Sequence, residues 1–265
     1  MKKHNVRRLL VLVLVVALCL LCGAAAQPNP KEIHIYSADD FVQLSKSCKL
    51  DTYSQGKTVY LDSDVDLSGS KFVPIPTFGG TFEGQGHTVS GLELSGDASH
   101  MGLFRYVQAV GTVRDLKATG NIDAAGTLNE IGAIVGTNYG TISGCSFSGT
   151  ISGQNNVGGI AGLSRGTIRG CSNTGPVGYQ HVGYNMGGIA GLQSGEISEC
   201  TNTGPIQGRK DVGGIAGQFE PYTSLTYGPS PSQQLADSMS GLFDQLDRFA
   251  TQVNDMGSRG TEDAQ

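Results

Sequence analysis

The sequence predicts an all-β fold: a right-handed parallel β-helix solenoid with an N-terminal capping helix and a C-terminal heptad helix. The first observation is a glycine-rich phrase that begins at Ile131, Val157, Met186 and Val212 and reads V-G-G-I-A-G in two of its four copies. The copies are 26, 29 and 26 residues apart, and a fixed period of this size is typical of stacked structural repeats. The second is composition, because short β-branched stretches alternate with Gly, Asn, Ser and Thr and show no amphipathic helical period. We therefore expect three short strands and three glycine-rich corners in each coil.

The N-terminus has the pattern of a targeting segment. An apolar run over 9–21 follows a basic head, and Ala24–Ala26 offers a cleavage site of small residues. The run is too short for a comfortable membrane span, so we expect a signal peptide over 1–26, export, and no membrane span after cleavage. The alternatives are an uncleaved anchor helix and lipidation of Cys22, although Leu21 occupies a position where a lipoprotein signal has a small residue. The basic residues are Lys2, Lys3, Arg7 and Arg8.

A capping segment is expected over 27–57. Ser37 has the character of a helix N-cap, acidic residues follow it, and Phe41, Leu44 and Cys48 recur at helical spacing. An open solenoid end would pair with another chain, and a helix over that end prevents it. We expect this helix to cover the first coil.

The solenoid itself is expected over 58–219. Its first strands are predicted at Thr58–Leu61 and Phe72–Ile75, and a degenerate repeat begins at Met101. Equivalent positions of successive coils face the same way, so the isoleucines of the recurring phrase should form one inward column. These are Ile134, Ile160, Ile189 and Ile215.

Cysteines occupy one repeated position, at Cys145, Cys171 and Cys200, with steps of 26 and 29 residues. Stacked inward positions suit small apolar residues, and a free cysteine behaves as one. We expect an inert, mostly reduced stack, although neighbouring coils are close enough for a disulfide. Asn173 and Asn202, each two residues later, should form a structural amide ladder.

Beyond the solenoid, a proline-containing linker is expected over 220–232, a heptad helix over 233–256 and a disordered tail over 257–265. The apolar positions are spaced alternately by four and three residues, as in a coiled-coil seam. They are Leu235, Met239, Leu242, Leu246, Phe249, Val253 and Met256. We expect self-association through this helix; packing against its own domain is the alternative. The pattern leaves open whether the chain is the front of a longer protein or a truncated product.

Charge and motifs exclude several function classes. The formal net charge is −5 and no Lys/Arg cluster follows the N-terminus, which argues against nucleic acid as a partner. No H-E-x-x-H motif and no repeated carboxylate position is present, so neither a catalytic residue nor a cofactor is expected. Asp62, Asp64 and Asp66 have the spacing of a calcium loop but lack its later Gly and Glu. We interpret them as a solvent-facing edge, with calcium as the weaker reading.

Two exposed aromatic residues, Tyr179 and Tyr184, lie in the longer 29-residue unit. The extra residues should project as a loop, and loops on a rigid scaffold frequently carry binding sites. We therefore expect these tyrosines to contact an extracellular glycan or protein ligand.

The G-G-I-A-G phrase, with the G-x-I-x-x-C/S phrase that follows, resembles the GLUG repeat over roughly Asp39–Glu220. The segment Phe82–Leu92 matches the sequence that commonly precedes such repeats. The resemblance implies a β-helix from a large secreted or wall-associated bacterial protein, as found upstream of the catalytic region in immunoglobulin A metallopeptidases. It does not imply peptidase activity here. We expect an exported, non-enzymatic surface or extracellular module for adhesion or as a stalk. The alternative is a carbohydrate-active enzyme (polysaccharide lyase or glycoside hydrolase) or its accessory domain.

Overall fold

The computed structural model describes residues 31–96, 99–124, 129–220, 235, 238–249 and 251. The predicted signal peptide, nearly all of the predicted linker and the predicted tail lie outside the described residues. The chain divides into two compact units, 1–222 and 223–265. No helix in the described part is both long and apolar enough to cross a membrane.

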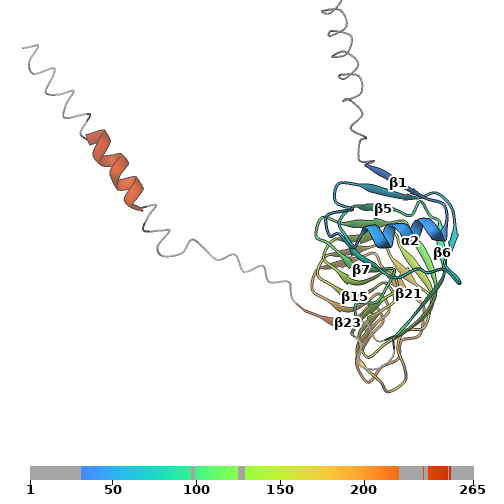
Figure 1. The fold of residues 1–265 in the computed structure, drawn as a ribbon. Helices are drawn as coiled ribbons and strands as arrows, with labels where there is room; N and C mark the ends of the chain where they lie inside the picture. The colour runs from blue at the N-terminus through green and yellow to red at the C-terminus, as the bar shows by residue number, and fades with distance from the viewer. Residues whose placement is uncertain are drawn as a thin grey trace, which may run out of the picture. The chain divides into compact units, whose positions relative to one another are not determined.

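The first unit is a solenoid in which four parallel sheets run along the stack of coils (Figure 1). The first sheet contains β1 (Glu32–Ile35), β2 (Thr58–Leu61), β5 (Thr81–Glu83), β8 (Thr112–Arg114), β12 (Thr141–Ser143), β16 (Thr167–Arg169) and β20 (Glu196–Ser198). The second contains β3 (Val65–Asp66), β6 (Thr88–Gly96), β9 (Lys117–Ala124), β13 (Ser146–Ser152), β17 (Ser172–Asn173) and β21 (Thr201–Asn202).

The third sheet contains β4 (Ile75–Phe78), β7 (Phe104–Val107), β11 (Val135–Asn138), β15 (Ala161–Ser164), β19 (Ala190–Gln193) and β23 (Ala216–Phe219). The fourth contains β10 (Asn129–Gly132), β14 (Asn155–Gly158), β18 (Tyr184–Gly187) and β22 (Lys210–Gly213). The predicted parallel β-solenoid is thereby confirmed.

Each repeat forms four strands, and the expectation of three was wrong. The recurring phrase does not run straight but bends: Ile131 and Gly132 end β10, and Val135 begins β11. The second residue of the phrase lies so close to backbone that a Cβ on Gly132 would meet the Val135 carbonyl oxygen. Glycine therefore permits a tight corner inside the phrase, and one expected strand becomes two.

The register places equivalent residues directly over one another. Ile131 pairs with Val157, Val157 with Met186, and Met186 with Val212. The 29-residue coil keeps this register on both sides, and its chain forms a small antiparallel bridge between Tyr179 and Val182. The extra residues are thus accommodated as the predicted loop.

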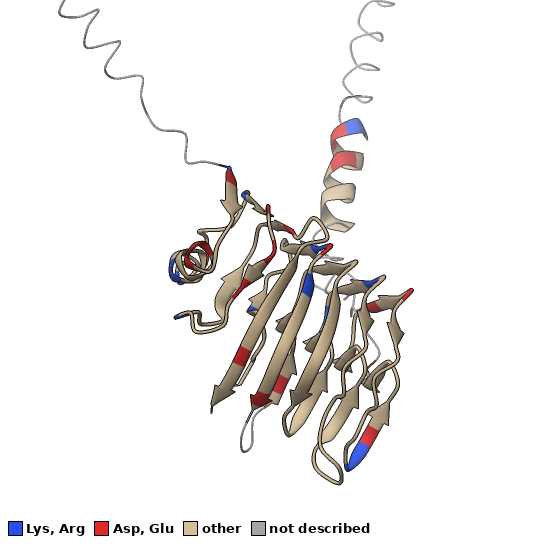
Figure 2. Cartoon of the chain, turned by 90° about the vertical axis from the view of Figure 1, so that its right-hand side faces the viewer, with Lys and Arg blue, Asp and Glu red and all other residues tan. Residues whose placement is uncertain are grey.

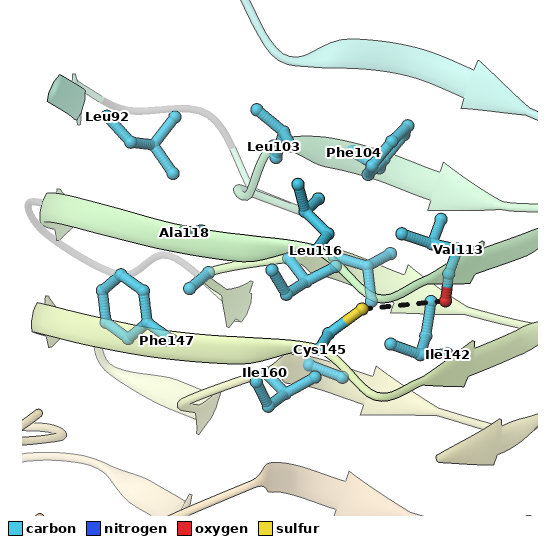
Figure 3. Close-up of a cluster of buried hydrophobic side chains, with 14 of the residues drawn as sticks. Leu92, Leu103, Phe104, Val113, Leu116, Ala118, Ile142, Cys145, Phe147 and Ile160 are labelled. Carbon is cyan, nitrogen blue, oxygen red and sulfur yellow. Dashed lines mark hydrogen bonds between the residues drawn. The ribbon is translucent and has the colours of Figure 1, made fainter. Parts of the chain in front are cut away.

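The interior is an apolar column through the stack, and Figure 3 shows part of it with side chains from successive coils. Ile134, Ile160 and Ile189 are fully buried, and Ile215 in the last coil is half-buried. Full burial of each such side chain contributes about 2 kcal/mol. The first coils use aromatic residues instead, with the rings of Phe78 and Phe104 5.1 Å apart.

Helix α2 (Ala38–Ser47) begins at the predicted N-cap. The Ser37 hydroxyl accepts from the Asp40 backbone amide, and the Asp40 carboxylate accepts from the Ser37 amide at 2.9 Å, which makes a capping box. Phe41 is fully buried, and its ring centroid lies 5.9 Å from that of Phe82. The helix therefore packs on the first coil, as expected. The first parallel sheet begins earlier in the chain than predicted, because β1 precedes the helix and pairs with β2.

The second unit contains a helix whose described residues are 235, 238–249 and 251. Its apolar side chains are exposed, with values from 48% for Met239 to 64% for Phe249. Val253 and Met256 of the predicted seam lie outside the described residues. Association through this helix stays a prediction.

Candidate functional site

The two tyrosines proposed as ligand contacts have different surroundings. The Tyr179 hydroxyl donates a hydrogen bond to the Asp123 carboxylate and accepts one from Ser152 at 2.7 Å. This hydrogen bond lowers the pKa of Asp123 below its ordinary value, and partial burial followed by the same bond raises the pKa of Tyr179. Tyr179 therefore ties the loop to β9 and β13, which leaves only its ring face for a ligand.

Tyr184 belongs to a strand rather than to the loop. It begins β18, pairs with Asn155 on one side and Lys210 on the other, and is 37% exposed. The Arg209 guanidinium lies over its ring, 5.8 Å from the centroid, within range for a cation–π contact. Sequence reasoning missed Arg209 because it comes from the next coil.

The acidic run does not converge on one point. Asp62 contacts His34 at 2.6 Å, Asp64 accepts from the Thr88 amide at 2.8 Å, and Asp66 accepts from the Ser68 amide at 2.9 Å. Within the described ranges, no group of three or more His, Cys, Asp or Glu residues has the arrangement of a metal site. The pKa of each of these three carboxyl groups is lowered. Desolvation raises it, but hydrogen bonds that the ionised carboxylate accepts lower it by more.

Cys145 is equivalent to Leu116 of the preceding coil, because the next residues along the chain, Ser146 and Lys117, are paired in the sheet. Cys145 and Cys171 are each 1% exposed and Cys200 is half-buried; all three are free thiols. The Cys145 thiol points to the Val113 carbonyl oxygen of the coil before, at 3.7 Å (Figure 3). The other two thiols repeat this contact one coil later each.

Thiol burial has a consequence for pH dependence. The neighbouring Cys145 thiol, together with desolvation, raises the pKa of Cys171 from 9.0 to about 12, and burial raises the pKa of Cys48 to about 11. The unfolded chain loses these protons first, so the free energy of unfolding should fall as pH rises from about 9 towards 12. Urea titrations along this pH range measure it. An unchanged midpoint across the range would contradict the assignment.

We expect the four cysteines of residues 27–265 to resist alkylation at pH 8 while the protein is folded, and to react together in denaturant. Mass spectrometry before and after unfolding gives the adduct count. Substitution Cys171→Ala should cost about 1–2 kcal/mol as a small cavity. A quantitative Cys145–Cys171 or Cys171–Cys200 disulfide under non-reducing conditions would contradict the reading of an inert stack.

Amide ladders connect successive coils. The Asn173 side chain donates to the Asn202 side-chain oxygen at 2.8 Å, and each asparagine also bonds the backbone of the glycine two residues on. This is the ladder expected from the sequence. A second ladder was missed, in which Asn185 donates to Asn156 at 2.7 Å and Asn156 to Glu130 at 3.1 Å.

The second ladder follows a column of left-handed backbone conformation. Its φ values lie between 53° and 60° at His100, Glu130, Asn156, Asn185 and Asp211. Asn and Asp tolerate this region better than most residues. The signal was visible in the sequence, because a polar residue always precedes the recurring phrase.

A row of threonine hydroxyls also escaped the sequence analysis. Thr58, Thr81, Thr112, Thr141 and Thr167 are paired in register along the first sheet and are half-exposed. We call this row the threonine ladder. Open hollows of about 580 Å³ at Thr58 and Thr81 and about 390 Å³ at Thr167 lie along it. Each threonine after the first follows a glycine, so the repeated G-T dipeptide was the available signal.

Lys, Arg, Asp and Glu residues of both signs are spread over the coils (Figure 2). Arg114 pairs with Glu83 at 2.5 Å and Arg169 with Glu199 at 3.0 Å, each pair bridging successive coils. Exposed pairs of this kind contribute little stability.

The chain is similar in sequence to a known repeat motif and to one curated protein. The sequence pattern of the GLUG motif matches residues 128–152, which contain β10 to β13 and so one full coil. The chain carries a GLUG motif. Residues in a 144-residue region covering 50% of the chain are 27% identical to halomucin of Haloquadratum walsbyi, and the match spans 2% of halomucin.

A solved structure shares the fold of the solenoid. It is described as a "putative immunoglobulin A1 protease" from Bacteroides ovatus, and it superposes with a TM-score of 0.52 at 22% sequence identity. The alignment covers 73% of this chain and 62% of that one. At this identity the likeness establishes the fold alone.

Proposed function

We propose that this protein is an exported, non-catalytic surface or extracellular module that acts as a stalk and contacts a glycan or protein ligand. The observation that carries the proposal is the distribution of carboxylates on the described surface. Glycoside-cleaving enzymes need two carboxyl groups facing one bond. Here Asp62, Asp64, Asp123 and Glu83 each bond a separate partner: His34, the Thr88 amide, Tyr179 and Arg114.

Other features support a structural role outside the cell. The signal-peptide pattern favours export. The interior is mostly apolar along the coils, and asparagine and threonine side chains lie in register from coil to coil. In the resemblance to metallopeptidases the repeats lie upstream of the catalytic region, which agrees with an accessory role.

The ligand surface that we propose first is the Tyr184–Arg209 pair beside the projecting loop. Tyrosine rings stack on sugar and peptide faces, and a guanidinium adds hydrogen-bond donors. The threonine ladder is the second surface, because regularly spaced hydroxyls suit an extended polar ligand.

A binding array of glycans and extracellular-matrix proteins tests the proposal with purified residues 27–265. Tyr184→Ala should weaken capture at the loop, and the matched control is Tyr36→Ala, since Tyr36 is 62% exposed in the first coil. Thr141→Val with Thr167→Val removes two ladder hydroxyls while keeping branched side chains. Capture by none of the array's ligands, or equal loss in the control, would refute the proposed ligand surfaces. Hydrolysis or lyase products from any arrayed polysaccharide would favour the enzyme alternative.

A further inference from the structure

The last coil of the solenoid exposes positions that every earlier coil buries. Ile131, Val157, Met186 and Val212 form one column of equivalent residues. The first three side chains are fully buried, whereas the side chain of Val212 is 45% exposed. In a second column, Phe219 is paired with Gln193 of the coil before. The Gln193 side chain is fully buried, whereas that of Phe219 is 60% exposed. These side chains therefore have the places of core residues and lack a coil above them within the described residues.

Backbone pairing ends at the same place. The isoleucine carbonyl oxygens of the recurring phrase accept two amides from the coil before, as Ile189 does from Ile160 and Ala161 at 2.9 and 3.0 Å. Ile215 accepts in the same way from Ile189 and Ala190. Among the described residues no further coil offers acceptors to the amides of Ile215 and Ala216. We call this end of the stack, formed by β20 to β23, the terminal edge.

The opposite end of the stack differs. Helix α2 packs there on the first coil, with Phe41 fully buried, and its Ser45 hydroxyl donates to the Val73 carbonyl oxygen at 2.8 Å. Among the described residues, the terminal edge is the end of the stack that no helix covers. Such edges are templates for pairing with another chain.

The chain's own next segment is a poor cover for the terminal edge. Residues 221–234 number 14, whereas a coil of this solenoid takes 26 to 29 residues. The segment also contains Pro221, Pro229 and Pro231, which lack the amide that strand pairing needs. It is too short and too rich in proline to pair with all four edge strands.

We propose that the terminal edge binds the terminal edge of a second copy. Two copies meeting end to end are related by a twofold axis, so each presents the same patch to the other. Val212, Ile215 and Phe219 of both copies then complete one shared apolar core. Because this contact uses the same patch of both copies, it is satisfied once two copies have met, and the assembly closes as a dimer.

The connectivity of the chain strengthens this pairing. The heptad helix is joined through 221–234 to Glu220, directly after β23. Dimerisation at the terminal edge tethers two such helices to one place, which raises their effective concentration for each other. Edge and helix are thus two separate contacts of the same dimer.

Sedimentation velocity of residues 27–265 over a wide concentration range tests the proposal. The edge variant is Val212→Lys with Phe219→Lys; both side chains are already solvent-accessible in one copy, so the lysines are tolerated there but would be buried without partners in the dimer. The helix variant is Leu242→Asp with Leu246→Asp. The control is Val110→Lys, at a side chain that is 71% exposed.

We expect dimers for the unchanged chain, the control and the helix variant. The edge variant should dissociate at concentrations where the unchanged chain is dimeric, and the combined edge and helix variant should be monomeric. Circular dichroism establishes that each variant keeps its β-solenoid. A helix variant that is monomeric while folded would overturn the proposal, as would species larger than a dimer. Slow hydrogen exchange of β22 amides in such a monomer would assign the edge to a segment of its own chain.

Discussion

Substitution Gly158→Ala is expected to destabilise the solenoid by about 3 kcal/mol, at the upper end of overpacking effects. An added Cβ would meet the Ala161 carbonyl oxygen, and it would lie 2.7 Å from both the Ala190 Cα and the Gly191 nitrogen. All three atoms belong to backbone, so relief requires a shift of two coils rather than a rotation of one side chain. Urea denaturation followed by circular dichroism measures the loss.

A control for this substitution lies in the last copy of the phrase, one position later. A Cβ on Gly214 has no atom within 4 Å, because no described coil follows. At concentrations where the protein is monomeric, Gly214→Ala should be neutral or slightly stabilising, through reduced freedom of the unfolded chain. Equal destabilisation by both substitutions would show that the close approach between coils at Gly158 does not limit stability.

Substitution Ile160→Ala should cost about 4 kcal/mol, because it leaves a cavity between two fully buried isoleucines of neighbouring coils. Ile160 itself has 0% exposure, with Ile134 and Ile189 at the equivalent positions on either side. Thermal and urea denaturation of residues 27–265 give the change in stability.

The same substitution at the terminal edge provides the comparison. Ile215→Ala removes the same atoms from a half-buried position, so a loss of only about 1 kcal/mol is expected. The stabilities of the Ile160→Ala and Ile215→Ala variants should be measured at concentrations where the protein is monomeric, because a dimer would bury Ile215 further. A cost at Ile215 equal to that at Ile160 in the monomer would contradict the column as described.

Repetition made the coil and its register predictable from sequence. The spacing of the phrase fixed which residues overlie one another, and the register pairs of Val157 and Met186 follow it. The capping helix was predictable because Ser37, Asp40 and Phe41 carry a local signal that needs no knowledge of the rest of the fold. Local and periodic patterns are the two kinds of information that one sequence contains without alignment.

Contacts between coils were harder to foresee. The corner inside the phrase depends on how closely Gly132 approaches a neighbouring carbonyl, which composition does not reveal. The Tyr179 bond to Asp123 joins residues 56 apart in sequence, and the contact of Arg209 with Tyr184 joins residues separated by the strands β18 to β21. The sequence therefore indicated the longer coil that carries the two tyrosines, whereas the residues that contact them could be identified only from the structure.

The loop of the 29-residue coil also bears on how such a protein can diversify. Pairs of residues before and after it, such as Asn155 with Tyr184 and Ser172 with Thr201, keep the same parallel register as in the coils without it. A length change at this corner is absorbed outside the ladder and costs the stack only the entropy of a slightly longer loop. Insertions at this corner can therefore change the surface of a coil without disturbing the pairing of its strands.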